Sequence, residues 1–144
     1  KLGLAYSIDC RATSLSDVGT FDFDVTVSKE KIPQIAKAIL EEIKKFVEDG
    51  PTEEEVDHVK TRYVYDLDFD LDDPYKQILR YGFVKLFSKE ISDKEEKQII
   101  KAITPSEILE AAKRIFVRDR LNLIMVGPLT DDLKTELENL ANQF

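Results

Sequence analysis

The spacing of apolar residues changes at Ser28, and this change constrains the fold more than any other feature of the sequence. Before Ser28, apolar and polar residues alternate over residues 4–12 and 21–27, which predicts two strands, each with one apolar face. The segment between them is rich in Ser, Asp and Gly, which predicts an antiparallel hairpin. After Ser28, apolar residues recur every three or four positions, which is typical of amphipathic helices.

Capping signals divide the part of the chain after Ser28 into helices. Ser28 opens the first helix, and Gly50 followed by Pro51 ends it. Residues 63–71 also fit a strand, but the helical spacing before them favours a helix. A last helix follows residue 130. The other predicted helix starts are three capping boxes and one Asp-Pro pair: Thr52 with Glu55, Asp73 with Pro74, Ser92 with Glu95, and Thr104 with Glu107.

The order of these elements predicts the fold class. The apolar run from Leu121 to Val126 predicts a buried strand, so two strands, five helices, one strand and one helix follow each other. This order predicts an α+β fold with helices layered on one face of a mainly antiparallel sheet. Three strands are few for so many helices, and Lys1 leads directly into a strand pattern, so we expect an N-terminally truncated domain. No linker divides the chain, and residues 1–144 are predicted to form this single, incomplete domain.

Composition excludes several classes of function. The net charge of −8 argues against nucleic acid as a partner. No apolar run reaches the roughly 18 residues of a membrane span, and the residues that follow Lys1 do not have the pattern of a signal peptide. The lack of such a run predicts a soluble protein with no membrane partner. The single cysteine, Cys10, cannot form an internal disulfide, which fits a reducing compartment, so we expect a cytoplasmic protein. The single histidine, His58, argues against a catalytic zinc site in this chain.

Other candidate sites have simpler structural interpretations. His58 lacks a second histidine at helical spacing and is interpreted as a surface or half-buried helix residue. Cys10 lies on the predicted apolar strand face, which favours a buried structural thiol over a nucleophile. No GxSxG elbow or glycine-rich phosphate loop is present. A series of aspartates lacks the glycine and glutamate of a calcium loop and is interpreted as a solvated face: Asp66, Asp68, Asp70, Asp72 and Asp73.

Tyr6 becomes a candidate functional residue only when the residues around it are considered. By alternation alone it is an apolar-face strand residue. The segment Lys1-Leu2-Gly3-Leu4-Ala5-Tyr6-Ser7, however, resembles the non-zinc C-terminal domain of the pitrilysin/insulinase family of zinc metallopeptidases. Further matching segments follow in the family's order: Gly19 to Val27, Ile32 to Val47, Gly50-Pro51-Thr52-Glu53-Glu54-Glu55-Val56, Arg80-Tyr81-Gly82, Thr104-Pro105-Ser106-Glu107-Ile108 and Leu123 to Pro128.

The resemblance implies two related α+β domains that have different roles and face each other across a cavity. The zinc-bearing domain carries His-x-x-Glu-His, which this chain lacks, so zinc is expected in the partner domain and no cofactor here. The other domain supplies a tyrosine and an arginine that hold the substrate and polarise its scissile carbonyl. Tyr6 matches the tyrosine, and is the expected catalytic and substrate-binding residue. The arginine would fall about seven residues before Lys1.

The expected function is therefore that of a C-terminal domain or partner subunit of a zinc-dependent endopeptidase. Such a domain is expected to close the peptide-binding cavity, and this chain alone is expected to be inactive. Its expected partners are the zinc-bearing domain or subunit and the peptide substrate. The alternative that the resemblance leaves open is a non-catalytic scaffold or peptide-binding subunit of the same fold. Self-association through an exposed sheet edge is a further possibility.

Overall fold

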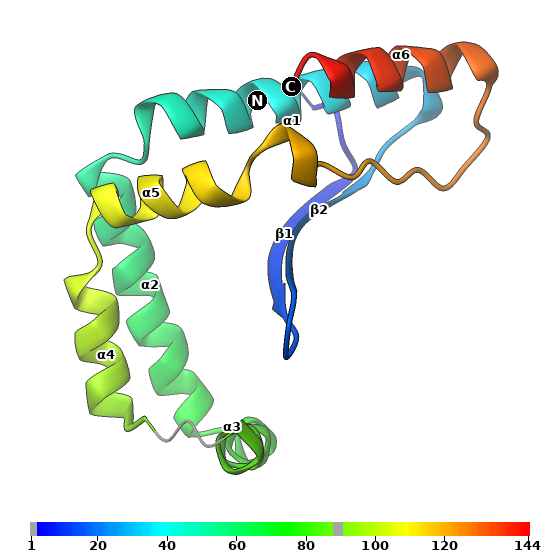
Figure 1. Ribbon diagram of the computed structural model, residues 1–144. Coiled ribbons are helices and arrows are strands. Elements are labelled where there is room, and N and C mark those ends of the chain that lie inside the picture. Colours follow the sequence, from blue (N-terminus) through cyan, green and yellow to red (C-terminus); the bar gives the residue numbers. More distant parts are fainter. Residues whose placement is uncertain (1–2, 88–90) are drawn as a thin grey trace. The chain divides into compact units, whose positions relative to one another are not determined.

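The computed structural model describes residues 3–87 and 91–144 and confirms the α+β class (Figure 1). Two strands are followed by six α-helices and two short 3₁₀ helices. Their bounds are β1 Ser7–Ser14, β2 Gly19–Thr26, η1 Lys29–Lys31, α1 Ile32–Asp49, α2 Glu53–Leu71, α3 Pro74–Phe87, α4 Asp93–Ala102, α5 Pro105–Ile115, η2 Arg118–Arg120 and α6 Asp131–Asn142. Residues 63–71 are helical, as the preceding spacing predicts.

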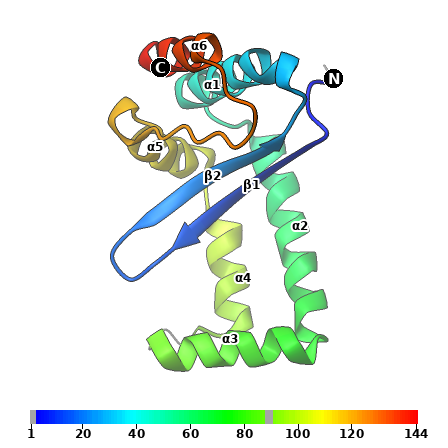
Figure 2. The ribbon, with the colours of Figure 1, turned by 90° about the vertical axis from the view of Figure 1, so that its right-hand side faces the viewer.

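The predicted N-terminal hairpin is confirmed. Strands β1 and β2 pair antiparallel over their full length, with Ser7 opposite Thr26 and Ser14 opposite Gly19 (Figure 2). Ser28 precedes α1, but its side chain makes no cap hydrogen bond, and the 3₁₀ helix η1 comes first. The hairpin is the only sheet in the part of the chain that the structure describes.

The chain forms two compact units, and the first contains Lys1–Asp49 and Ala111–Phe144. In this unit α6 lies beside α1 (Figures 1 and 2). The Lys44 ammonium donates to the backbone oxygen of Gln143 at 2.7 Å, which joins the end of α6 to α1. The buried apolar side chains of the unit are Ile43, Ala112, Leu133 and Leu137.

The second unit, Gly50–Glu110, contains α2, α3, α4 and the first half of α5. Its helix starts confirm the predicted caps, because Thr52 and Ser92 each form a reciprocal capping box with the glutamate three residues later. Thr104 and Glu107 exchange the same hydrogen bonds at the start of α5. Asp73 accepts from the amide of Tyr75 at 2.9 Å and so caps α3. Its buried residues are Val56 and Leu67.

Gly50 is required at the junction of α1 and α2. Its φ is +73°, and a Cβ placed on it would lie 3.3 Å from Leu109 Cδ2 on α5. Gly50→Ala is therefore expected to lower the free energy of unfolding by about 1–2 kcal/mol, through backbone strain and crowding together. Urea unfolding followed by circular dichroism measures the change. Thr52→Ser, which keeps the cap two residues away, is the control and should unfold within about 0.5 kcal/mol of wild type. Equal stability of Gly50→Ala and wild type would contradict the argument.

The prediction of a buried strand from Leu121 to Val126 is wrong. The segment forms no strand, and Ile124 and Val126 are 85% and 97% exposed. An apolar run becomes a buried strand only when neighbouring strands satisfy its backbone and cover both of its faces. No described strand lies in the correct place to pair with this segment. The run is therefore an exposed apolar segment.

Apolar exposure is general in both units. The chain exposes 11461 Å² of surface, whereas two separate globules of these sizes would expose roughly 9,000 Å². Among the described residues, six hydrophobic side chains are buried and none of the large ones is fully covered. Such a surface is typical of a polypeptide that functions against a partner. Within the described ranges, no helix combines the length and apolar character needed to cross a membrane.

Candidate functional site

Tyr6 lies at the entrance to β1, and its backbone is held in place by β2. Its amide donates to the carbonyl of Thr26 at 2.8 Å, which extends the ladder by one residue beyond Ser7. By alternation, Tyr6 shares a strand face with Ile8 and Cys10. The backbone on which the phenol is mounted is therefore fixed by hydrogen bonds.

The phenol of Tyr6 is open to solvent. The residue is 81% exposed, so the apolar strand face to which alternation assigns Tyr6 is not covered at this side chain. Among the described residues, none forms a hydrogen bond with its hydroxyl. A neutral phenol in this state can donate to an incoming oxygen without first breaking an internal bond. This arrangement matches the requirements of a hydrogen-bond donor for a ligand.

Within the first unit, an aromatic cluster joins the hairpin to Phe116, the residue that follows α5. The Phe116 ring contacts Phe21 edge to face, with centroids 5.2 Å apart, and lies 6.3 Å from Phe23. Phe21 and Phe23 contact each other at 5.4 Å. These contacts fix β2 and leave β1, which follows Tyr6, exposed along its whole length. The apolar strand face is thus covered only at the β2 side.

Cys10 is exposed, so the prediction of a buried structural thiol is wrong. It faces Phe23 across the hairpin, but no helix covers that part of β1. Partial desolvation and the negative charge of Asp9 raise the pKa of the Cys10 thiol. A raised pKa reduces the thiolate fraction at neutral pH, which agrees with the prediction that Cys10 is not a nucleophile.

Cys10 is expected to react with iodoacetamide in the folded protein, at a rate below that of a free cysteine peptide at the same pH. Exposure permits the reaction, and the raised pKa slows it because only the thiolate attacks. Mass spectrometry of the native protein measures the rate between pH 7 and 9. Full labelling only after addition of urea would contradict the exposed position.

The predicted secondary candidates occupy surface positions. His58 is exposed on α2, which confirms its interpretation as a surface helix residue. In the aspartate series, Asp66 lies 3.6 Å from Arg62, and Asp68 and Asp70 form ion pairs with Lys97 and Lys76. Nowhere in residues 3–87 and 91–144 do three or more His, Cys, Asp or Glu side chains form a group that could hold a metal.

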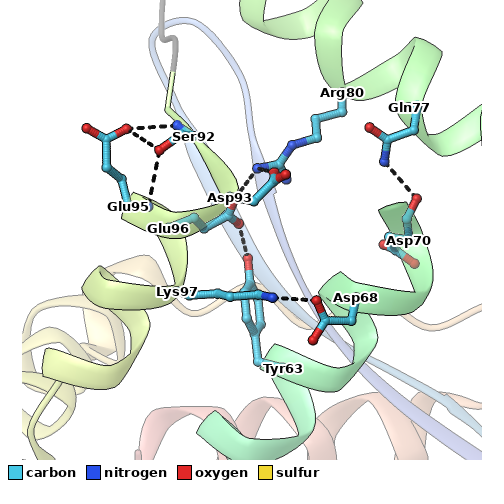
Figure 3. A network of polar contacts seen from close by, with 10 residues as sticks. All are labelled: Tyr63, Asp68, Asp70, Gln77, Arg80, Ser92, Asp93, Glu95, Glu96 and Lys97. Carbon is cyan, nitrogen blue, oxygen red and sulfur yellow. Dashed lines mark hydrogen bonds and ion pairs between the residues drawn. The ribbon is translucent and has the colours of Figure 1, made fainter. Parts of the chain in front are cut away.

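The second unit contains a polar network between three helices (Figure 3). The Tyr63 hydroxyl on α2 donates to Glu96 Oε1 on α4 at 2.6 Å. Arg80 on α3 donates to the other oxygen of Glu96 and lies 2.8 Å from Asp93 Oδ1. Lys97 pairs with Asp68, so an ion pair joins α4 to α2 in addition to the Tyr63 hydrogen bond. The network connects α2, α3 and α4.

The titration properties of the network follow from these contacts. The hydrogen bond to Glu96, with partial burial, raises the pKa of Tyr63 to about 12. Burial opposes ionisation of Glu96, but hydrogen bonds from Tyr63 and Arg80 outweigh it and lower the pKa of Glu96. Burial likewise opposes the charge of Arg80, and Glu96 and Asp93 overcome it, so the pKa of Arg80 is raised. Each group is held in the charge state that its partner requires, which is typical of a structural clamp.

Sequence reasoning did not identify this clamp. Arg80 enters the prediction only within a family-like segment, and Tyr63 only as part of a helix face. The signal available in the sequence was the spacing of Gln77, Arg80 and Val84, three and four residues apart, which places two polar residues on one face of the helix. The structure shows that this face is half-buried. A polar inward face predicts charged partners on the neighbouring helices.

The N-terminal part of the chain matches a known family model. Residues 1–63 match the family model described as the Peptidase M16 inactive domain. The matched range contains the hairpin, α1, Tyr6 and the Thr52 capping box. This finding supports the resemblance of residues 1–63 to the non-zinc domain of pitrilysin-type peptidases.

A curated relative extends the similarity over most of the chain. Over 129 residues, or 89% of this chain, the sequence is 28% identical to a protein of Rickettsia bellii (strain RML369-C) described as "Uncharacterized zinc protease". The chain spans 31% of that relative's length. It is therefore similar to one part of a larger zinc protease.

Proposed function

We propose that this chain is the non-zinc domain or partner subunit of a zinc-dependent endopeptidase and that it closes the peptide-binding cavity. The observation that carries the proposal is the family match over residues 1–63, which include Tyr6. The Tyr6 phenol is exposed, forms no hydrogen bond with the residues that the structure describes, and leads directly into a paired strand. Zinc is assigned to the partner domain because the described residues include no group of three or more His, Cys, Asp or Glu side chains that could hold it. The cytoplasm is the proposed compartment.

Tyr6 acts in this proposal on the scissile carbonyl. When a peptide carbon is attacked, negative charge develops on its oxygen, and a fixed donor stabilises that charge more than the starting carbonyl. Tyr6 remains neutral and donates its hydroxyl proton into a hydrogen bond. The backbone bond between Tyr6 and Thr26 restricts the position from which the phenol reaches the substrate. Tyr6 therefore both binds and polarises the peptide.

We further propose that residues 1–144 function as one domain, with the helices on one face of a mainly antiparallel sheet. The boundary between the two compact units falls inside α5, between Glu110 and Ala111, so a continuous helix contributes to both. The exposed surface in excess of two compact globules, together with the many exposed large apolar side chains, supports a role in association. Both features are those of a domain that is completed by a partner.

Reconstitution tests the proposed function. The purified chain is mixed with the zinc-bearing half of the same peptidase, and cleavage of a quenched fluorescent peptide library is measured with binding of the two halves. We expect no cleavage by either half alone and cleavage by the mixture. A zinc half that binds this chain and is fully active without it would contradict the catalytic role. Peptide binding without cleavage by the mixture would favour the scaffold or peptide-binding alternative.

A further inference from the structure

The residues that lead from Gly3 to Tyr6 lie before the strand ladder and are held by a lysine side chain. The ladder ends at Tyr6, whose amide donates to the carbonyl of Thr26 at 2.8 Å. Upstream of it, the Lys31 ammonium on η1 donates to the carbonyl oxygen of Gly3 at 3.1 Å. Within the described residues, this is the one hydrogen bond that reaches residues 3–5. The short segment before the phenol is therefore fixed at both ends.

Lys31 is itself mounted on ordered backbone. It is the last residue of η1, and its amide donates to the carbonyl of Ser28 at 3.0 Å. Its bond to Gly3 spans 28 residues of sequence, so it joins the chain that leaves β2 to the chain that enters β1. The segment that carries Tyr6 cannot shift relative to η1 without breaking this contact.

Gly3 supplies the backbone conformation at the other side of the contact. Its φ is +57°, in the left-handed region that other residues rarely adopt. A Cβ placed on Gly3 would meet nothing within 4 Å, so crowding does not require a glycine here. The direction of the Gly3 carbonyl depends on this conformation, and the carbonyl is the group that Lys31 holds.

We propose that Lys31 is a positioning residue for Tyr6: by holding the Gly3 carbonyl, it fixes the segment from which the phenol reaches the scissile carbonyl. This inference rests on the proposed function, because it gives Lys31 a role only through Tyr6. The Tyr6 side chain is largely exposed, so its placement depends on its backbone. A donor stabilises developing charge best when its position is set before the reaction begins.

Lys31→Met tests the proposal in the reconstituted peptidase. Methionine keeps an unbranched side chain and removes the ammonium, so the bond to Gly3 is lost. We expect kcat to fall by about three- to tenfold with little change in KM, because a loosely held donor stabilises the transition state less. The loss is smaller than that of Tyr6→Phe, since Leu4 and Ala5 are half-buried and keep the segment near its place. Lys31→Arg keeps a cationic donor and should restore most of the rate.

Lys29→Met is the matched control. Lys29 is an exposed lysine of the same 3₁₀ helix, and its substitution should leave kcat within about twofold of wild type. Binding of every variant to the zinc half is measured, so that rates are compared at full association. Equal kcat values for Lys31→Met and wild type, or equal losses for Lys31→Met and Lys29→Met, would overturn the proposal.

A double substitution separates positioning from a direct effect of the lysine charge. If Lys31 acts through Tyr6, Lys31→Met should change kcat of the Tyr6→Phe protein by less than about twofold. A further loss as large as that in the wild-type background would mean that Lys31 acts by its own charge, and the positioning role would be refuted.

Amide hydrogen exchange of this chain gives a readout that does not depend on cleavage. Mass spectrometry of peptides that cover residues 3–7 should show faster exchange in Lys31→Met and wild-type exchange in Lys29→Met, because the bond to Gly3 no longer restrains the segment. Unchanged exchange in Lys31→Met would contradict the proposal whatever the rates. If Tyr6→Phe cleaves at the wild-type rate, the proposed role of Tyr6 fails, and faster exchange then shows a contact that holds the segment without positioning a donor.

Discussion

Tyr6→Phe is expected to lower kcat of the reconstituted peptidase by about 30- to 1000-fold, which corresponds to about 2–4 kcal/mol of transition-state stabilisation. The substitution removes one hydroxyl and keeps the ring, so the strand and the surface remain unchanged. KM should change little, because the hydrogen bond strengthens as charge develops on the carbonyl oxygen. Steady-state cleavage of a single fluorescent peptide, at saturating concentrations of this chain, measures both constants.

The matched control is Tyr65→Phe. Tyr65 is also a largely exposed tyrosine, but it lies on α2 in the second unit, and its substitution should leave kcat unchanged. Affinity for the zinc half is measured separately for all three proteins, so that weaker assembly is not mistaken for slower chemistry. If Tyr6→Phe cleaves at the wild-type rate with the two halves fully associated, Tyr6 has no role in the mechanism. The domain pairing would remain unaffected by that result.

Arg80→Met is expected to lower the free energy of unfolding by about 2–3 kcal/mol. The Arg80 and Glu96 side chains are only 21% and 19% exposed, and removal of the guanidinium leaves Glu96 and Asp93 as neighbouring carboxylates without their shared cation. The second unit has few buried apolar residues to compensate, since only Val56 and Leu67 are buried in its described part. Urea unfolding followed by circular dichroism at fixed protein concentration measures the loss.

Arg62→Met separates this effect from the general loss of a charge. Arg62 pairs with Asp66 at 3.6 Å, but both side chains are well exposed, so its substitution should cost less than about 0.5 kcal/mol. Glu96→Gln combined with Arg80→Met should recover part of the loss, because the unpaired carboxylate is then neutral. Equal destabilisation by Arg62→Met and Arg80→Met would show that the clamp contributes nothing specific.

Local signals in the sequence account for the helix boundaries. The capping boxes at Thr52 and Ser92 satisfy amides within four residues, so they can be predicted without the rest of the fold. Gly50 likewise ends α1 through its own positive φ. The hairpin also follows from alternation over adjacent segments. Each of these features depends on contacts close in sequence.

Burial could not be predicted in the same way. Leu121 to Val126 has the composition of a core strand, yet becomes exposed because no described strand pairs with it. Cys10 and Tyr6 lie on the predicted apolar strand face, but the Phe116 cluster covers the hairpin only along β2. An apolar pattern states which residues can be covered, and the neighbours that cover them are distant in sequence.

The sequence by itself therefore determined the class of elements, their capped ends, the resemblance to a non-zinc peptidase domain and Tyr6 as its candidate residue. Tertiary structure decided that the Tyr6 phenol is open to solvent, that Arg80 is held by Glu96 and Asp93, and that the apolar side chains of α3 are exposed. The physical reason is the range of the interactions involved. Caps and alternation operate over a few residues, whereas exposure and ion pairing depend on helices brought together from separate parts of the chain.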